Sequence, residues 1–139
     1  MKIILYGKPI TKKNSGRIIT NGKRPFILPS KQFVAYEKDC KRQITGKYRV
    51  GIDYPVNLKA LYYMPTRHRV DLTNLLNATN DILVDCNVLE DDNSKIIVSH
   101  DGSRVLYDKE NPRAEIYIEK ITEEEKEKIE QERVSESNR

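Results

Sequence analysis

Residues 67–96 read RHRVDLTNLLNATNDILVDCNVLEDDNSKI, and this stretch carries the clearest helical pattern of the 139-residue chain. Asp71 has the chemistry of a helix N-cap, so we expect a helix from there to about residue 84. The apolar side of that helix falls at helical spacing and consists of Leu72, Leu75, Leu76, Thr79 and Leu83. A separate polar stripe consists of Asn74, Asn77 and Asp81. The stretch therefore predicts an amphipathic helix whose apolar side packs on a core.

Alternating apolar residues on both sides of this helix predict strands. The alternation is clearest in residues 54–64, where Val56, Leu58, Ala60 and Tyr62 share one side. Further strands are expected at residues 2–7, 94–99, 103–107 and 114–119. The strands 94–99 and 103–107 are expected to flank a turn at Asp101-Gly102.

Residues 8–30 hold prolines, glycines and many basic side chains, which predicts a long loop with a brief strand at Pro25–Leu28. Ser30 is a suitable N-cap for a helix over residues 31–45, and Gly46 is expected to close it. The apolar stripe of that helix comprises Phe33, Tyr36, Cys40 and Ile44. Its opposite stripe comprises Lys31, Lys38 and Arg42, which either face solvent or contact a nucleic-acid backbone.

The order of these elements is strand, helix, strand, helix and then two or three strands. This order predicts an α/β (α+β) fold with a single domain over residues 1–120. Its simplest packing is a mixed β-sheet of four to five strands with two helices packed on it. Residues 121–139 form a charged tail, expected as a frayed helix or a disordered segment, with Thr122 and Glu125 as a capping box.

The charge of the chain is distributed unevenly. Residues 1–70 carry 16 Lys or Arg against three Asp or Glu, whereas residues 71–120 carry 5 against 11. A strongly basic segment indicates a polyanionic partner, of which nucleic acid is the commonest. The alternative is that the lysines only keep the surface soluble.

The sequence also bears on the compartment. No stretch approaches the roughly 20 apolar residues that a membrane span needs, so we expect no membrane contact. Cys40 and Cys86 are too few for a disulfide framework and lack metal-ligand spacing. We therefore expect two free thiols in a cytoplasmic protein.

Acidic residues near the central helix are candidates for metal chemistry. Hydrolysis of a phosphodiester is helped by Mg²⁺, which a few carboxylates hold with open coordination sites. Asp71 begins the helix, and Asp91-Asp92, next to Glu90, follow it. A helix of about 14 residues carries the chain about 20 Å away, and about seven residues can run back over that length. On their own, Asp71 is more simply an N-cap and residues 90–93 a polar turn.

The stretch from Arg67 to Ile96 resembles the signature region of the RusA family of Holliday-junction resolvases. Members typically carry basic residues, then D-x-D-N-L, a helix and a D-D pair. The matching positions here are Arg67, Arg69, Asp71, Asn74, Leu75, the acidic helix position Asp81, and the pair Asp91-Asp92. The N-terminal GKPITKKNS also resembles the opening of the family, so the similarity spans residues 1–120.

The resemblance implies a RusA-like fold that binds Mg²⁺, with Mn²⁺ as a possible substitute, and cuts four-way junctions and other branched DNA as a homodimer. It implies Asp71, Asp91 and Asp92 as metal ligands and catalytic residues, with Asn74 bonded to a carboxylate or a metal-bound water. The expected DNA contacts are Lys12, Lys13, Asn14, Arg17, Lys23, Arg24, Arg67 and Arg69. A symmetric dimer suits a junction, which offers two equivalent strands to nick.

Two positions depart from the family pattern. Thr73 replaces the second carboxylate of D-x-D, and Asn77 replaces a lysine that members often carry one turn into the helix. These departures leave open a junction-binding protein of the same fold that has lost or weakened catalysis. A third alternative is a small protein-interaction domain whose acidic half and tail meet a basic partner.

Overall fold

The structure is a computed structural model that describes residues 1–12, 17–20, 22 and 25–137, without the side chains of 17–20, 25–27 and 133–137. The strands are β1 (Lys2–Tyr6), β2 (Arg17–Thr20), β3 (Pro25–Leu28), β4 (Val56–Met64), β5 (Ile97–Ser99), β6 (Arg104–Tyr107) and β7 (Arg113–Lys120). The helices are α1 (Lys31–Gln43), the 3-10 helix η2 (Gly46–Tyr48), α2 (Leu72–Asp85) and α3 (Glu123–Ser137).

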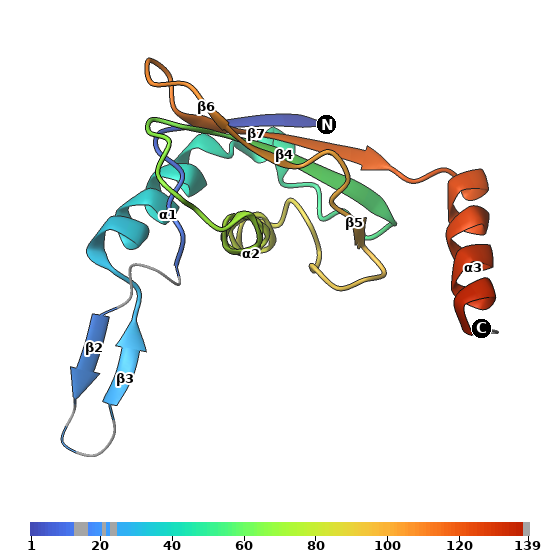
Figure 1. Cartoon of the computed structure of the whole chain (residues 1–139), viewed down its shortest axis with the longest axis horizontal. Coiled ribbons are helices and arrows are strands. Elements are labelled where there is room, and N and C mark those ends of the chain that lie inside the picture. The colour runs from blue at the N-terminus through green and yellow to red at the C-terminus, as the bar shows by residue number, and fades with distance from the viewer. Residues whose placement is uncertain (13–16, 21, 23–24, 138–139) are drawn as a thin grey trace.

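The centre of the molecule is a mixed five-stranded sheet, as the sequence predicted. Strands β1, β7 and β4 pair antiparallel in that spatial order. Both β5 and β6 pair parallel with the other edge of β4. Helices α1 and α2 lie on the same face of the sheet (Figure 1). The fold class is therefore an α/β (α+β) sheet with helices packed on it.

The core lies between β4 and α2. Alternate residues of β4 are buried from Val56 to Met64, which confirms the predicted strand and its inner side. The predicted apolar stripe of α2 is also buried, except for the half-buried Leu72. The hydroxyl of Tyr62 is 2.7 Å from the hydroxyl of Thr79, which itself donates to the carbonyl of Leu75 at 3.0 Å. These bonds satisfy polar groups whose burial without a partner is costly, and burial raises the pKa of Tyr62.

Helix α1 begins where the sequence predicted and ends earlier. The Ser30 hydroxyl accepts a hydrogen bond from the Phe33 amide at 3.0 Å, which confirms the N-cap. The helix stops at Gln43, and Gly46 begins η2 in place of closing α1, so that prediction was wrong. The physical reason is Arg49, whose guanidinium donates to the carbonyls of Ile44 and Lys41, both at 3.1 Å. A side chain thus satisfies the carbonyls that a C-terminal glycine motif otherwise covers.

Strands β5 and β6 flank the turn at Asp101-Gly102, as the sequence predicted, and each of them pairs with β4. The Asn57 side-chain oxygen accepts hydrogen bonds from the Asp101 amide at 2.8 Å and from the Ser99 hydroxyl at 2.6 Å. The Ser103 hydroxyl accepts another from the Ala60 amide at 3.0 Å. These bonds hold the turn against the edge of β4. The chain therefore follows β4 from one parallel pairing to the next, and residues 94–96 form a turn before β5.

The segment between β1 and α1 contains a two-stranded antiparallel sheet, β2 with β3. The brief strand at Pro25–Leu28 was predicted, whereas β2 was not. Figure 1 shows this hairpin standing apart from the central sheet.

The tail forms the helix α3. The Thr122 hydroxyl accepts a hydrogen bond from the Glu125 amide at 3.2 Å, which is one half of the predicted capping box. Of the helices in the described part of the chain, none is both long and apolar enough to cross a membrane. Cys40 and Cys86 are free and buried, and burial raises the pKa of Cys40 to about 11.

Candidate functional site

Asp71 caps the beginning of α2. Its Oδ1 accepts hydrogen bonds from the amides of Thr73 at 2.9 Å and Asn74 at 3.3 Å. Both bonds end on the same oxygen, so they do not occupy Oδ2. The side chains of Asp71 and Thr73 are exposed, and that of Asn74 is half-buried. Asp71 therefore has a structural role that holds whether or not it also binds a ligand.

Asp91 is bonded within the turn that follows α2. Its Oδ1 accepts from the Asp92 amide at 2.8 Å, and its Oδ2 accepts from the Asn93 side-chain amide at 2.9 Å. The bonds from Asp92 and Asn93 lower the pKa of Asp91. Asp91 is thus an ionised turn residue whose two oxygens already accept hydrogen bonds.

Asp92 faces a hollow of about 220 Å³ that we call the acidic hollow. It is lined by Lys12, Glu37, Asp81, Val84, Asp85 and Asp92. Loss of hydration raises the pKa of Asp81, Lys12 opposes this, and the charges of Asp92, Asp85 and Glu37 add to it. The repulsion shows that these carboxylates share one electrostatic environment.

Lys41 neutralises part of this charge. Its ammonium lies 3.5 Å from a Glu37 oxygen and 3.3 Å from an Asp85 oxygen. Partial burial works against the charge of Lys41, but its contacts with Asp85 and Glu37 outweigh this and raise its pKa. The charges of Glu37 and Asp85 are therefore partly balanced by one lysine of the protein itself.

The structure brings Asp92 to Asp81, and Asp71 does not line the acidic hollow. Asp71 precedes Asp81 by ten residues, which places it about 15 Å away along the helix axis. The chain after α2 is held near the end of that helix by bonds to Gly51 and Ile52. The Gly51 amide donates to Asn87 O at 2.8 Å, the Ile52 amide to Val88 O at 2.9 Å, and the Glu90 amide to Ile52 O at 2.9 Å. Because of these bonds, the chain after α2 runs back along the helix only as far as Asp81, and Asp92 does not reach Asp71.

The acidic hollow suits a divalent cation in the chemistry of its donors, because Mg²⁺ prefers carboxylate oxygens. A cation there would also relieve the repulsion that, added to the loss of hydration, raises the pKa of Asp81. The donors are spread apart, and in the described part of the chain no three His, Cys, Asp or Glu residues gather into a group that could hold a metal ion.

A second hollow, of about 210 Å³, lies beside the start of α2, and we call it the basic hollow. Its charged or titratable lining residues are Lys8, His68 and Arg69. Residues 8–11 line the basic hollow and Lys12 lines the acidic one, so the short segment 8–12 joins the two. Cationic and anionic side chains thus occupy adjoining hollows on either side of this segment.

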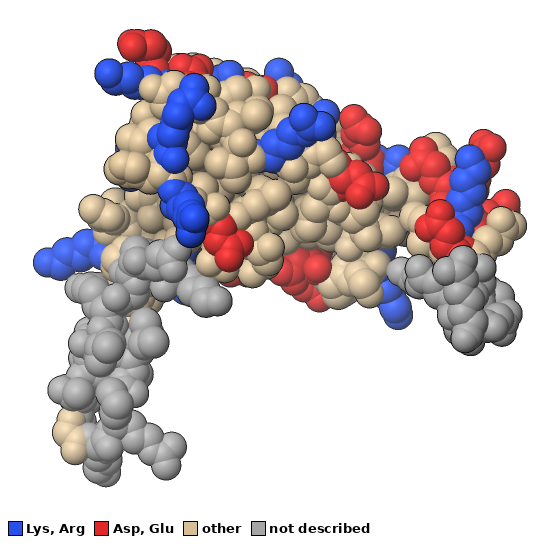
Figure 2. All heavy atoms as spheres, in the orientation of Figure 1, with Lys and Arg blue, Asp and Glu red and all other residues tan. Residues whose placement is uncertain are grey.

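The other expected DNA contacts are less well defined. Arg67 and Arg69 are exposed in the loop between β4 and α2, and Lys12 is exposed at the acidic hollow. Arg17 lies in β2, and its side chain is not described. Lys13, Asn14, Lys23 and Arg24 lie outside the described residues. On the face seen in Figure 2, many Asp and Glu lie around α3, and most of the Lys and Arg lie on the side away from it, with some of the other charge in each region.

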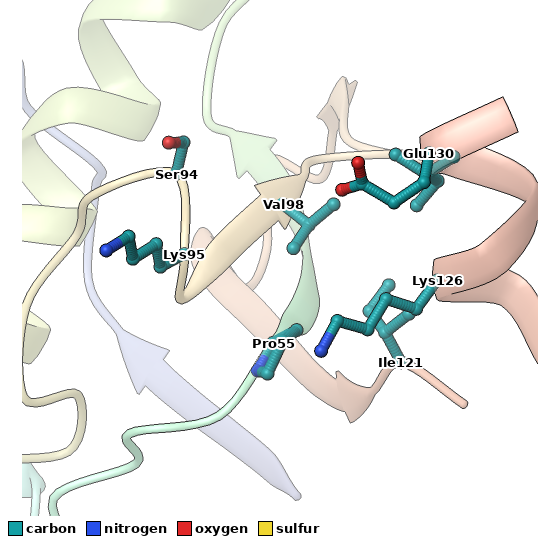
Figure 3. Close-up of a pocket in the computed structure, with 8 residues that line it drawn as sticks. Pro55, Ser94, Lys95, Val98, Ile121, Lys126 and Glu130 are labelled. Carbon is teal, nitrogen blue, oxygen red and sulfur yellow. The ribbon is translucent and has the colours of Figure 1, made fainter. Parts of the chain in front are cut away.

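Sequence reasoning did not single out Lys8, Glu37 or Asp85. Only their places in the fold give them a role, since nothing in the local pattern of Glu37 on α1 or Asp85 on α2 predicts that they meet. A further hollow of about 440 Å³ lies between β5 and α3, with Pro55, Val98 and Ile121 among its lining residues (Figure 3). None of the candidate residues lines it, so it stands outside the candidate site.

Protein-family models and curated proteins contain no match to this chain.

Proposed function

We propose that this chain is a Mg²⁺-dependent endonuclease that hydrolyses phosphodiesters in branched DNA, four-way junctions included. The observation that carries the proposal is that the segment of residues 8–12 lines both the basic hollow and the acidic hollow. A nuclease needs cations that hold phosphates and, next to them, carboxylates that hold a metal. The RusA-like pattern from Arg67 to Asp92 supports the same activity.

In this proposal Lys8, Arg67 and Arg69 bind phosphates, and affinity falls steeply with salt. Asp92 is the metal ligand that the arrangement favours most. The RusA-like pattern gives Asp71 and Asp91 as further metal ligands, whereas the lining of the acidic hollow gives Asp81. When bound, Mg²⁺ activates a water and neutralises charge on the phosphate. Asn74, half-buried after the Asp71 cap, orients a carboxylate or a metal-bound water.

We further propose a cytoplasmic homodimer that acts in DNA recombination and repair. Two active sites related by a two-fold axis match the two strands of a junction that must be nicked. Recognition then depends on the shape of the junction more than on base edges.

The test is nicking of a synthetic four-way junction with Mg²⁺ or Mn²⁺. We expect Asp92→Asn to lower the rate by at least about 100-fold, because even residues that only support metal ligands are worth 10–100-fold. The rates of Asp71→Asn and Asp81→Asn show whether Asp71 or Asp81 is the second metal ligand, because the variant that lacks this ligand is the slower one. Asp53→Asn, an exposed aspartate that does not line the acidic hollow, is the matched control. If the wild type cuts no branched substrate with either metal, the enzyme proposal is abandoned.

A second candidate is a junction-binding protein of the same fold without catalysis. It is favoured by Thr73 and Asn77, both exposed on α2 where the RusA-like pattern has charged residues. This candidate predicts tight, salt-sensitive junction binding and no cleavage with either metal. Appearance of activity in a Thr73→Asp/Asn77→Lys variant would favour it over the first.

A further inference from the structure

The helix-side face of the sheet is open at β6. Tyr62 and Met64 of β4 are buried under the helical layer. Their neighbours across the pairing are Val105 and Tyr107 of β6, which lie on the same side of the sheet. Val105 and Tyr107 are nevertheless 37% and 40% exposed. The helices therefore cover β4 and leave an aromatic and an aliphatic side chain of β6 open to solvent.

These side chains line a hollow of about 340 Å³. The opposite wall is the loop after β4, with Thr66, Arg67 and His68. The guanidinium carbon of Arg67 lies 4.2 Å from the centroid of the Tyr107 ring. No Asp or Glu lines this hollow, and among the described residues Arg67 forms no ion pair. The guanidinium thus lines the hollow, and no carboxylate of the described residues balances its charge.

We propose that Tyr107 and Arg67 form a stacking site for an unpaired nucleobase. Aromatic rings and arginine planes are the surfaces on which proteins stack unpaired bases. Arginine also binds the phosphate that accompanies the base. A volume of about 340 Å³ lies within the range of small-ligand sites.

The position of the hollow favours a nucleic-acid strand over a polypeptide. Thr66 and His68 line both this hollow and the basic hollow, where Lys8 and Arg69 lie. A strand whose base stacks on Tyr107 therefore has cations along its path toward α2. A paired base keeps both faces within the duplex, so the site selects branched or gapped DNA. This inference rests on the proposed function only in taking DNA as the substrate.

The experiment measures binding by fluorescence anisotropy in EDTA, so that cleavage plays no part. The two ligands are a gapped duplex with unpaired thymines and the same duplex fully paired. Tyr107→Ala removes the ring, whereas Tyr107→Phe retains it. Tyr54→Ala is the matched control, because Tyr54 is 39% exposed with the Lys120 ammonium 5.0 Å from its ring centroid. Tyr54 precedes β4, whose length from Val56 to Met64, the neighbour of Tyr107, is about 25 Å at the rise of a strand.

We expect Tyr107→Ala to weaken binding of the gapped ligand about tenfold, within the range of one stacked base. We expect Tyr107→Ala to change binding of the paired duplex only slightly. We expect Tyr107→Phe and Tyr54→Ala to bind both ligands as the wild type does. A second measurement needs no variant: 5-iodouracil at an unpaired position is irradiated, and we expect the photo-crosslink at Tyr107.

The inference is overturned if Tyr107→Ala binds the gapped ligand as wild type does, if it weakens both ligands equally, or if wild type binds neither. A crosslink of the wild-type protein at a residue other than Tyr107 also overturns it. This result decides the question even if Tyr107→Ala does not fold. Loss of cleavage alone bears on the proposed function and not on this site. A protein partner on the β6 edge would give Tyr107-dependent capture of protein with no effect on DNA binding, which contradicts the inference.

Discussion

The two ends of α2 handle charge in opposite ways. At the start, Asp71 is bonded to backbone amides of its own helix, and the neighbouring Arg67 and Arg69 are exposed. In the last turns, Asp81 and Asp85 face Asp92 across a hollow, and loss of hydration, with repulsion from these carboxylates added, raises the pKa of Asp81. Cationic side chains therefore gather in the loop before α2, and anionic side chains gather at its last turns.

The largest expected effect comes from inverting the charge at the start of α2. Arg67→Glu/Arg69→Glu should weaken DNA binding and reduce the slope of log K against log salt by about two, one for each phosphate that an arginine no longer neutralises. Anisotropy titrations at several salt concentrations measure both. Lys120→Glu/Lys128→Glu changes the net charge equally at two exposed residues by α3. Equal losses in the two variants would mean that net charge, and not this surface, governs binding.

A smaller effect separates the structural role of Asp71 from its proposed role in chemistry. Asp71→Ala removes the cap and should lower the free energy of unfolding by about 1 kcal/mol, whereas Asp71→Asn should change it by only a few tenths. Urea unfolding measures both values, and Ser30→Ala at the α1 cap provides a comparison of the same size. If Asp71→Asn were as destabilising as Asp71→Ala, the carboxylate charge would be needed for the fold.

The smallest effect concerns the acidic end. The pKa of Asp81 in the folded state lies above its ordinary 3.8, so the unfolded state gives up this proton first as pH rises. Stability from this residue is thus present below pH 3.8 and lost as pH rises through the folded pKa. Asp81→Asn should remove this loss, a few tenths of a kcal/mol at a surface site. Thermal unfolding from pH 3 to pH 6 measures this pH dependence of stability, with Asp53→Asn as the control. Identical profiles for wild type and Asp81→Asn would show that the environment of Asp81 does not destabilise its ionised form.

Local patterns predicted most of the fold. The alternation in β4 and the stripe on α2 reflect burial on one side, which depends only on spacing along the chain. Strand β2 was missed although Ile18, Ile19 and Thr20 are β-branched and Asn21-Gly22 is a common hairpin dipeptide. The basic composition of the segment concealed that signal.

The end of α1 was predicted wrongly because a side chain outside the helix, that of Arg49, decides it. The turn between β5 and β6 was predicted, but its attachment to β4 through Asn57 and Ser103 was not. The same holds for the candidate site. Sequence reasoning named both Asp81 and Asp92, but it did not predict that they line one hollow. That follows from the bonds of residues 87–90 to Gly51 and Ile52, which no local pattern contains.

The most direct test is to locate a divalent ion on the protein in solution, because the account places the metal site at the last turns of α2 and the phosphate contacts before its start. Mn²⁺ broadens the NMR signals of nuclei close to it, and a substoichiometric titration reports where it binds first. We predict that the amide signals of Asp81, Asp85 and Asp92 broaden before those of Thr73 and Asn74, and that Asp92→Asn raises the Mn²⁺ concentration required. Broadening that begins at Thr73 and Asn74, or that shows no preference along α2, would contradict the account.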